Sequence, residues 1–349
     1  MNIKVVNEVK GQYQIAEGVS KSDLQKLATD PKTSCIQFAR PLLKNEIDQL
    51  EKYVFSNRPD ISLRVYGHYN EGCDLTFLER IPSLRKVSAD CLMEATGIEV
   101  VTKLENLEEL CVGIFSLDNF DFLENVNPNL KELSLYQTKS KKPKIDCIAR
   151  FKGLEFLYLE GQQKGIESIN ELKKLQRIIL RSVSTSDLKF LIGLSDLWSV
   201  DIKLGGIKDF SAIETLSGLK YLELWQIKGL NDLSFISKLT NLQNLYLQSL
   251  KQVKSLPDFS ALENLRRIYL ENLKGLENLS SLEFAPGLEE FIYVLAQNQN
   301  PQNLISILKN PNVKKVFCRF GSDKKNNEFD RLANENGKEQ YKFSVFQYR

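Results

Sequence analysis

The chain has 349 residues, of which 42% are hydrophobic and 26% are charged, and these are the proportions of an ordinary soluble globular protein. Its 47 basic and 45 acidic side chains leave a formal net charge of +2, which provides no overall field to attract nucleic acid or an anionic membrane. We therefore expect neither of these partners. No run of about 18 apolar residues occurs, so the sequence predicts no transmembrane helix.

Six cysteines lie far apart in the chain and form no C-x-x-C pair. This spacing is typical of reduced, mostly buried thiols rather than of a disulfide scaffold. The amino-terminal sequence MNIKVVNEVKGQYQIAEG lacks the apolar core of a secretory signal. Both observations favour a cytoplasmic location.

The first 60 residues predict an amino-terminal cap that includes a degenerate first repeat. Alternating apolar and polar residues indicate a hairpin over Ile3–Val6 and Tyr13–Ile15. Helical spacing predicts a short helix over Ser22–Ala28 and an amphipathic helix over Leu42–Phe55. Cys35–Phe38, and Ile61–Val65 just beyond the cap, have the composition of strands and fit degenerate repeats.

Residues 61–320 are dominated by the phrase L-x-x-L-x-L, which occurs eleven times with conservative replacements. It begins at Leu84, Leu107, Leu130, Leu154, Leu175, Leu197, Leu219, Leu242, Leu265, Leu288 and Val313, in steps of 21 to 25 residues. Such a period is typical of a solenoid, in which each unit is too small to bury a core alone and stacks on its neighbours.

The repeat that begins at Leu242 shows how one unit works. Leu245 and Leu247 alternate with polar residues, which predicts a short strand with its leucines in the core. The return path contains further apolar residues but is too short for a full crossover helix. We expect turns or 3₁₀ segments there.

Residues 321–349 predict a carboxy-terminal cap, because a solenoid must cover the open end of its core. Asn326–Ala333 has the pattern of a helix. Tyr341–Phe346, with the sequence YKFSVF, has the alternation of a closing strand.

The repeats resemble the leucine-rich repeat family, in particular its short, internalin-like bacterial class of 22–23 residues, and segments such as DLSFISKLTNLQNLYL carry the likeness. The resemblance implies an α/β solenoid: a horseshoe with a parallel β-sheet on the concave face and short turns or 3₁₀ segments on the convex side. One feature differs from the family. Where its members usually place an asparagine that bonds the turn backbone, this chain has Thr138, Gln162, Val183, Gly205, Ile227, Leu250 and Leu273. We therefore expect irregular turns at those points.

The residue types needed for catalysis are scarce. The only histidine, His68, lies in the glycine-flanked sequence GHYNEG and is expected to be a solvated loop residue. The sequence has no phosphate-binding glycine motif and no cysteine–histidine spacing typical of zinc. It predicts a protein that is not an enzyme and that carries no cofactor or metal.

The variable positions of the repeat describe a surface. If the leucines point inward, the third, fifth and seventh positions of L-x-x-L-x-L point to the concave face. Aromatic residues and arginines, which often dominate protein interfaces, recur in these three columns together with acids. The candidate partner-binding residues are Tyr136, Phe156, Tyr158, Arg177, Arg181, Tyr221, Glu223, Trp225, Tyr246, Arg267, Tyr269 and Glu271.

A structural explanation of the same residues competes with this one. Stacked tyrosines such as Tyr246 and Tyr269 can stabilise a sheet by about 0.2–1 kcal/mol per pair. Like charges also fall in neighbouring repeats, namely Asp201 beside Glu223, and Arg181 beside Lys203. Diagonal pairing of Arg181 with Asp201 and of Lys203 with Glu223 would relieve this repulsion, and so would a partner of complementary charge.

The leading functional hypothesis is a non-catalytic module, monomeric when free, that binds another protein in its concave face. A more specific form is a bacterial cytoplasmic immunity or inhibitor protein that neutralises a toxin, by analogy with the use of the family. A carbohydrate-binding module draws on the same aromatic residues and is the main alternative. An enzyme is the least favoured reading.

Overall fold

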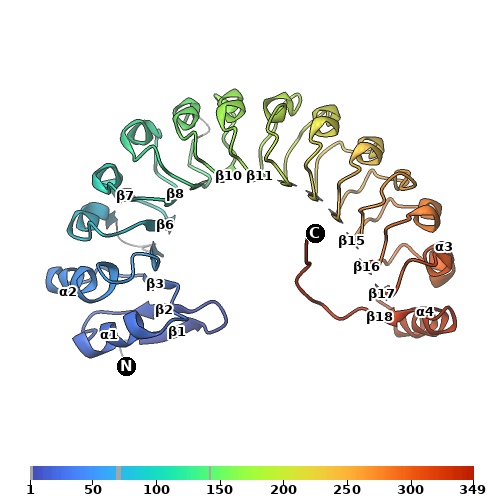
Figure 1. Cartoon of the computed structure of the whole chain (residues 1–349), viewed down its shortest axis with the longest axis horizontal. Helices are drawn as coiled ribbons and strands as arrows, with labels where there is room; N and C mark the ends of the chain where they lie inside the picture. The colour runs from blue at the N-terminus through green and yellow to red at the C-terminus, as the bar shows by residue number, and fades with distance from the viewer. Residues whose placement is uncertain (1–2, 68–71, 141–142) are drawn as a thin grey trace. The chain divides into compact units, whose positions relative to one another are not determined.

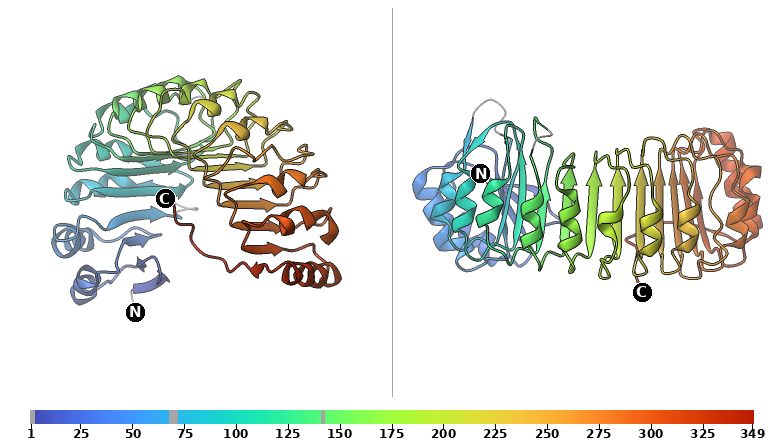
Figure 2. Two further views of the ribbon diagram at one scale, coloured as in Figure 1. Left: turned by 45° about the vertical axis from the view of Figure 1, so that its right-hand side comes forward. Right: turned by 90° about the horizontal axis from the view of Figure 1, so that it is seen from above.

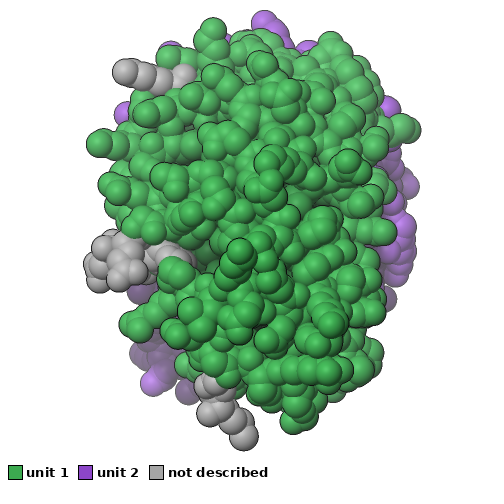
Figure 3. Space-filling view, turned by 90° about the vertical axis from the view of Figure 1, so that its left-hand side faces the viewer, with its two compact units in different colours: residues 1–175 green, residues 176–349 purple. Residues whose placement is uncertain are grey.

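The computed structural model describes residues 3–67, 72–140 and 143–349, so His68 lies outside the described residues. The chain divides into two compact units, residues 1–175 (unit 1) and residues 176–349 (unit 2), which Figure 3 shows in different colours. Within each unit, strands line the inner side of an arc and short helical segments line its outer side (Figure 1). This arrangement confirms the predicted solenoid of strands and 3₁₀ turns.

Unit 1 begins with the antiparallel pair β1 and β2, and every later strand of its sheet lies parallel to its neighbour. The strands, in their order across the sheet, are β1 (Ile3–Asn7), β2 (Gln12–Ile15), β3 (Cys35–Phe38), β4 (Ser62–Tyr66), β6 (Lys86–Leu92), β8 (Glu109–Ile114), β9 (Glu132–Leu135) and β10 (Phe156–Glu160). A separate small pair is β5 (Cys73–Asp74) with β7 (Ala95–Thr96).

Helical segments connect the strands of unit 1 on the outer side. The α-helices are α1 (Lys21–Thr29) and α2 (Lys44–Leu50), and α2 continues into the π-helical turn η1 (Glu51–Phe55). The 3₁₀ segments are η2 (Leu75–Arg80), η3 (Ile98–Lys103), η4 (Asp121–Asn125), η5 (Asp146–Arg150) and η6 (Ile166–Glu171).

Unit 2 has a wholly parallel sheet. Its strands are β11 (Arg177–Arg181), β12 (Ser199–Lys203), β13 (Tyr221–Trp225), β14 (Asn244–Gln248), β15 (Arg267–Glu271), β16 (Glu290–Val294), β17 (Lys315–Cys318) and β18 (Glu339–Gln340). Its outer segments are η7 (Lys189–Leu191), η8 (Ser211–Thr215), η9 (Ser234–Lys238), η10 (Ser280–Phe284), η11 (Pro301–Leu304), α3 (Ile305–Lys309) and α4 (Asp323–Glu335).

The register of the strands makes the repeat positions into columns. In unit 2, Asp201 pairs with Glu223, Glu223 with Tyr246, and Tyr246 with Tyr269. The intervening leucines, such as Leu245, are fully buried on the opposite face of the strands. The third, fifth and seventh positions of unit 2 therefore share its inner face, as the sequence predicted (Figure 2, right, shows the strands aligned).

Several outer segments, including η8 and η9, start at a short polar side chain that satisfies a first backbone N–H. Asp209 Oδ1 accepts a hydrogen bond from the Ser211 backbone N–H at 2.8 Å, and Asp232 Oδ1 accepts one from Ser234 N–H at 2.8 Å. This is the Asx-type capping that favours aspartate and asparagine at helix starts. The repeated sequences DFSA and DLSF are thus explained by local structure.

The prediction of irregular turns after the strands was wrong. In the repeats that begin at Leu175 through Leu288, the residue at the eighth position adopts a left-handed backbone conformation with φ between 51° and 56°. Its N–H donates to the carbonyl at the end of the next strand, as from Leu204 to Trp225 (2.9 Å) and from Gln226 to Gln248 (2.8 Å). This regular ladder satisfies the backbone without an asparagine, so the ninth position is free to hold buried apolar residues such as Val183 and Leu250.

In unit 1 a side chain takes part in the corresponding turn. Gln162 donates through Nε2 to the carbonyl of Tyr136 at 2.9 Å and accepts from the backbone N–H of Glu160 at 2.8 Å. Gly161, at the eighth position of this repeat, has φ +88°, a conformation that costs glycine little. Glutamine therefore replaces the asparagine of the family here.

The predicted elements of the amino-terminal cap are confirmed, with small shifts of their ends. The hairpin, the helix α1 and the strand β3 form where alternation and helical spacing placed them. Leu24, Leu27, Leu50 and Phe55 are buried where α1, α2 and η1 pack together. The Ser20 side chain caps α1 by accepting from Asp23 N–H at 3.1 Å.

At the carboxy-terminal end, the predicted helix is confirmed as α4, which buries Phe329 and Ala333. The predicted closing strand over Tyr341–Phe346 was wrong. The last strand is β18 (Glu339–Gln340), and residues 341–349 have no regular secondary structure. In Figure 1 this segment leaves β18 and returns along the inner side of unit 2 to the C mark.

All six cysteines are free thiols. Cys73 and Cys318 are buried, Cys35, Cys111 and Cys147 are half-buried, and Cys91 is exposed, so burial is less complete than the sequence suggested. None of the helices in the described residues is long and apolar enough to cross a membrane.

The left-handed turn can be tested at Leu295, which has φ 52° and a side chain that is 48% exposed. Leu295→Val should lower the free energy of unfolding by about 1–3 kcal/mol, because a β-branched side chain is strained at positive φ. Leu295→Gly should stay within about 1 kcal/mol of the wild type, because relief of strain offsets the flexibility gained by the unfolded chain. Urea unfolding followed by circular dichroism measures both, and equal effects would contradict the role of the turn.

Candidate functional site: the inner faces of the strands

The twelve predicted binding residues divide between the units, with Tyr136, Phe156 and Tyr158 in unit 1 and the other nine in unit 2. Nine of the twelve are half-buried. Arg177 is exposed, whereas Glu223 and Arg267 are buried. The surface is therefore more tightly packed than a row of free side chains, and its residues hold one another in place.

A network centred on Tyr246 lies on β14 and β15. The Tyr246 hydroxyl lies 2.7 Å from Glu271 Oε2 and 3.1 Å from Gln248 Oε1, both of which accept hydrogen bonds. Gln248 Nε2 donates to Glu271 Oε1 at 3.0 Å. The rings of Tyr246 and Tyr269 meet edge to face, with centroids 4.7 Å apart. Burial and the nearby carboxylate raise the pKa of Tyr246, so its hydroxyl stays protonated as a donor.

A second network lies on β12 and β13. Lys203 Nζ lies 3.0 Å from Glu223 Oε1 and 3.3 Å from Asp201 Oδ2, so one cation bridges two acids. The Tyr221 hydroxyl donates to the other oxygen of Glu223 at 2.7 Å. The predicted pairing of Lys203 with Glu223 is thus confirmed. The repulsion between the two carboxylates is relieved within the chain.

Asp201 is the least satisfied member of this network. The residue is only 8% exposed, and its Oδ1 atom is buried without a hydrogen-bond partner. Burial, followed by the negative charge of Glu223, raises the pKa of Asp201 to about 6. Lys203 opposes this shift but does not cancel it.

Two arginines of the predicted set contact aromatic rings. The guanidinium of Arg181 lies over the ring of Trp225, 5.5 Å from its centroid, which is a cation–π geometry. Arg267 makes an ion pair with Glu290, at 2.6 Å from Nη2 to Oε2. It also lies 5.1 Å from the ring centroid of Tyr341 and 4.9 Å from that of Phe346, both in the carboxy-terminal segment.

In unit 1, Tyr136 and Tyr158 contact each other with ring centroids 4.8 Å apart. The Tyr158 hydroxyl donates to Glu160 at 3.2 Å. Tyrosine pairs thus occur in both units, as the explanation by sheet stabilisation requires. Pairing does not remove them from the surface, because all four paired tyrosines remain half-buried.

A polar network among the first strands was not predicted from the sequence. Arg64 Nε donates to Asp90 Oδ1 at 2.9 Å, and Arg64 Nη1 donates to Gln37 Oε1 at 2.9 Å. The same guanidinium lies 4.4 Å from the ring centroid of Tyr66. Gln37 and Arg64 precede the first clear repeat. The one sequence signal that could have placed Gln37 and Arg64 on the inner face is the alternation of apolar and polar residues in β3 and β4.

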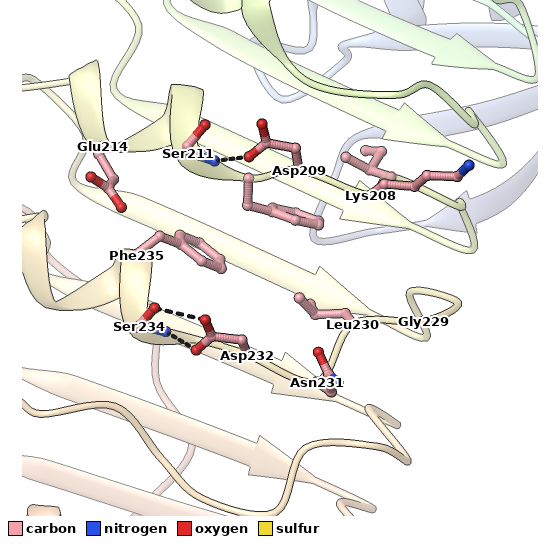
Figure 4. A pocket seen from close by; sticks show the side chains of 12 residues that line it. Lys208, Asp209, Ser211, Glu214, Gly229, Leu230, Asn231, Asp232, Ser234 and Phe235 are labelled. Carbon is pink, nitrogen blue, oxygen red and sulfur yellow. Dashed lines mark hydrogen bonds between the residues drawn. The ribbon is translucent and has the colours of Figure 1, made fainter.

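A cavity of about 230 Å³ lies on the flank of unit 2, between the outer segments that follow β12 and β13. Figure 4 shows its lining, in which Asp209 and Asp232 turn toward the serines that they cap. Phe210 and Phe235 also line it and stack with centroids 5.2 Å apart. Asp209 and Asp232 in this lining are thus engaged in starting η8 and η9.

Among the residues that the structure describes, no three or more histidine, cysteine, aspartate or glutamate side chains lie close enough together to hold a metal ion.

Comparisons with known proteins support the fold. No protein-family model matches the sequence, and no curated protein matches it. Among solved structures, a leucine-rich repeat protein of Leptospira interrogans is similar, with a TM-score of 0.52, 18% identity, and coverage of 95% of this chain and 88% of that one. An internalin from Listeria monocytogenes aligns with a TM-score of 0.48 and 16% identity over 90% of this chain and 88% of that one. The chain thus has the fold of a leucine-rich repeat protein.

The raised pKa of Asp201 predicts how stability depends on pH. The pKa is 3.8 in the unfolded chain and about 6 in the folded one, so between these values the folded state keeps a proton that the unfolded state loses. Folding stability should therefore fall by about 3 kcal/mol as the pH rises through this window. In Asp201→Asn that loss should be absent, so the free energy of unfolding of the variant should rise relative to that of the wild type between pH 4 and pH 7.

Urea unfolding at the two pH values measures this difference. Asp209→Asn is the matched control, because a backbone hydrogen bond lowers the pKa of Asp209. The control should change little relative to the wild type over this range, because its lowered pKa lies below the window. Parallel behaviour of the two variants would refute the assignment.

Proposed function

We propose that the chain is a non-catalytic binding module that holds another protein against the inner face of its strands. The proposed contact residues in unit 2 centre on Trp225, Tyr246 and Tyr269, with Arg181 and Glu271 beside them. Tyr136, Phe156 and Tyr158 form the corresponding patch in unit 1. The fold, shared with leucine-rich repeat proteins, supports a role in interaction, and the chemistry of the inner face supports its use as the contact.

The observation that carries the proposal is the pre-organisation of half-buried aromatic side chains. Tyr246 is held by Gln248, Glu271 and Tyr269, and Trp225 is held against Arg181. Side chains that are already fixed lose little conformational entropy on binding. Aromatic residues in such settings supply large contact areas and often dominate the affinity of protein interfaces.

The charged residues supply specificity in this proposal. Lys203, Asp201 and Glu223 neutralise one another within the chain, so they need no partner to be stable. Asp201 Oδ1 nevertheless lacks a hydrogen-bond donor. A partner that presents a donor at this position would satisfy a buried acceptor, and a partner that presents an acceptor would be disfavoured.

The test is co-purification of the tagged chain from its source organism, with the bound proteins identified by mass spectrometry. A partner recovered by the wild type should be lost with the Trp225→Ala/Tyr246→Ala double variant. Loss of two central aromatic anchors should weaken binding by at least about thirtyfold.

Phe284→Ala is the control for this experiment, since Phe284 is an aromatic residue that is 63% exposed at the end of η10 on the outer side. It should recover the partner as the wild type does. Unchanged recovery by a folded Trp225→Ala/Tyr246→Ala variant would overturn the proposed contact surface.

A further inference from the structure

Residues 341–349, here called the tail, lie across the strands of unit 2 near their amino-terminal ends. Figure 1 and the left view of Figure 2 show the tail leaving β18 and running inward. Its contacts begin beside β17, where Phe343 meets Phe317, and reach the start of β12, where Tyr348 meets Trp198. The tail thus crosses several repeats in an extended conformation.

The main chain of the tail is recognised by side chains of the repeats. Three carbonyl oxygens accept hydrogen bonds, from Arg267 to Ser344 (3.3 Å), from Arg266 to Gln347 (2.9 Å) and from Lys220 to Arg349 (3.0 Å). Gln243 both donates to the Arg349 carbonyl and accepts from its N–H, each at 2.9 Å. Lys220, Gln243 and Arg266 occupy the second position of successive repeats. Because every polypeptide has these carbonyls, this recognition does not depend on sequence.

The side chains of the tail are recognised through their aromatic rings. Phe343 packs edge to face on Phe317 with centroids 5.3 Å apart, and Tyr348 does the same on Trp198 at 5.2 Å. The ring of Phe346 lies between these two contacts, with the guanidinium groups of Arg266 and Arg267 at 5.0 Å and 4.9 Å from its centroid. These contacts require aromatic residues two or three positions apart.

The tail is nevertheless held loosely for a segment of a folded domain. It forms no β-ladder with any strand, and its side chains beyond the buried Tyr341 are only partly covered. Phe343 is 62% exposed, Val345 is 84% exposed and Tyr348 is 38% exposed. A segment with few buried apolar contacts opens at a low free-energy cost. Another polypeptide segment could therefore compete with the tail for the surface beneath it.

We propose that this surface is a binding groove for an extended, aromatic-containing segment of a partner protein, and that the tail occupies it within the same chain until such a segment replaces it. The tail groove is defined by Trp198, Lys220, Gln243, Arg266, Arg267 and Phe317. The repeats supply donors for the carbonyls of the incoming segment and rings or guanidinium groups for its aromatic side chains. The groove lies beside the proposed protein-binding residues and shares Arg267 with them.

The attachment of the tail determines how such a groove behaves. A tethered occupant competes as if present at a high local concentration, so a free segment binds only weakly while the tail is intact. Weakening the tail should expose the groove without altering the repeats.

The experiment uses Trp198 as the reporter. The chain has two tryptophans, so a Trp225→Phe background leaves Trp198 alone. In this background, Phe346→Ala/Tyr348→Ala should change the emission of Trp198, because Tyr348 packs on it. An acetylated synthetic peptide with the sequence of residues 341–349 should then restore the emission. It should bind this variant at least about tenfold more tightly than the chain with an intact tail.

Two controls accompany the titration. Val345→Ala changes the most exposed of these tail side chains and should leave peptide binding as weak as in the chain with an intact tail. Adding Lys220→Ala and Arg266→Ala to the Phe346→Ala/Tyr348→Ala variant should reduce the affinity for the peptide. Each substitution removes a side chain that donates a hydrogen bond to a backbone oxygen of the segment.

Failure of the peptide to bind the weakened-tail variant, or equal affinity for both chains, would overturn the proposal. A wild-type dimer in light scattering that Phe346→Ala/Tyr348→Ala dissociates would also overturn it, because the occupant would then be a second copy of the chain. The peptide is independent of the partner sought by co-purification. A negative result in one experiment therefore leaves the other informative.

Discussion

The parallel pairing of short strands in fixed register is the constraint on which the rest of this molecule depends. A repeat of some 23 residues cannot surround its own leucines, so Leu245 is buried only because the strands beside it pair in register. The same pairing brings residues of successive repeats within contact distance on the opposite face. The core and the candidate binding surface are therefore two results of one set of backbone hydrogen bonds.

This constraint explains why the inner face is made of networks rather than of independent side chains. Neighbouring strands lie about 4.8 Å apart, so a charge or a ring in one repeat always meets the equivalent residue of the next. This proximity is accommodated by favourable contacts. Lys203 forms ion pairs with Asp201 and Glu223, and the ring of Tyr246 packs against that of Tyr269. The side chains of such a face are held in place by contacts within the chain.

Features set by local periodicity could be predicted, whereas features set by distant contacts could not. The columns of unit 2 followed from the spacing of the leucines, and β3 from its alternation. The tail has the alternation of a strand, but what holds it are side chains such as Lys220 and Gln243, which are more than 100 positions away in the sequence. The left-handed turns were also missed, because Leu204 and Gln226 carry no signal of the kind that glycine provides.

The separation between the fixed register and the variable return path has a consequence for how such a chain can change. Steps between the repeats of unit 2 range from 22 to 25 residues, yet its strands remain aligned residue for residue. The longest step, from Leu288 to Val313, contains the α-helix α3 as well as a 3₁₀ segment. Insertions on the outer side are absorbed there, so one side of the molecule can acquire new segments while the strands on the other keep their register.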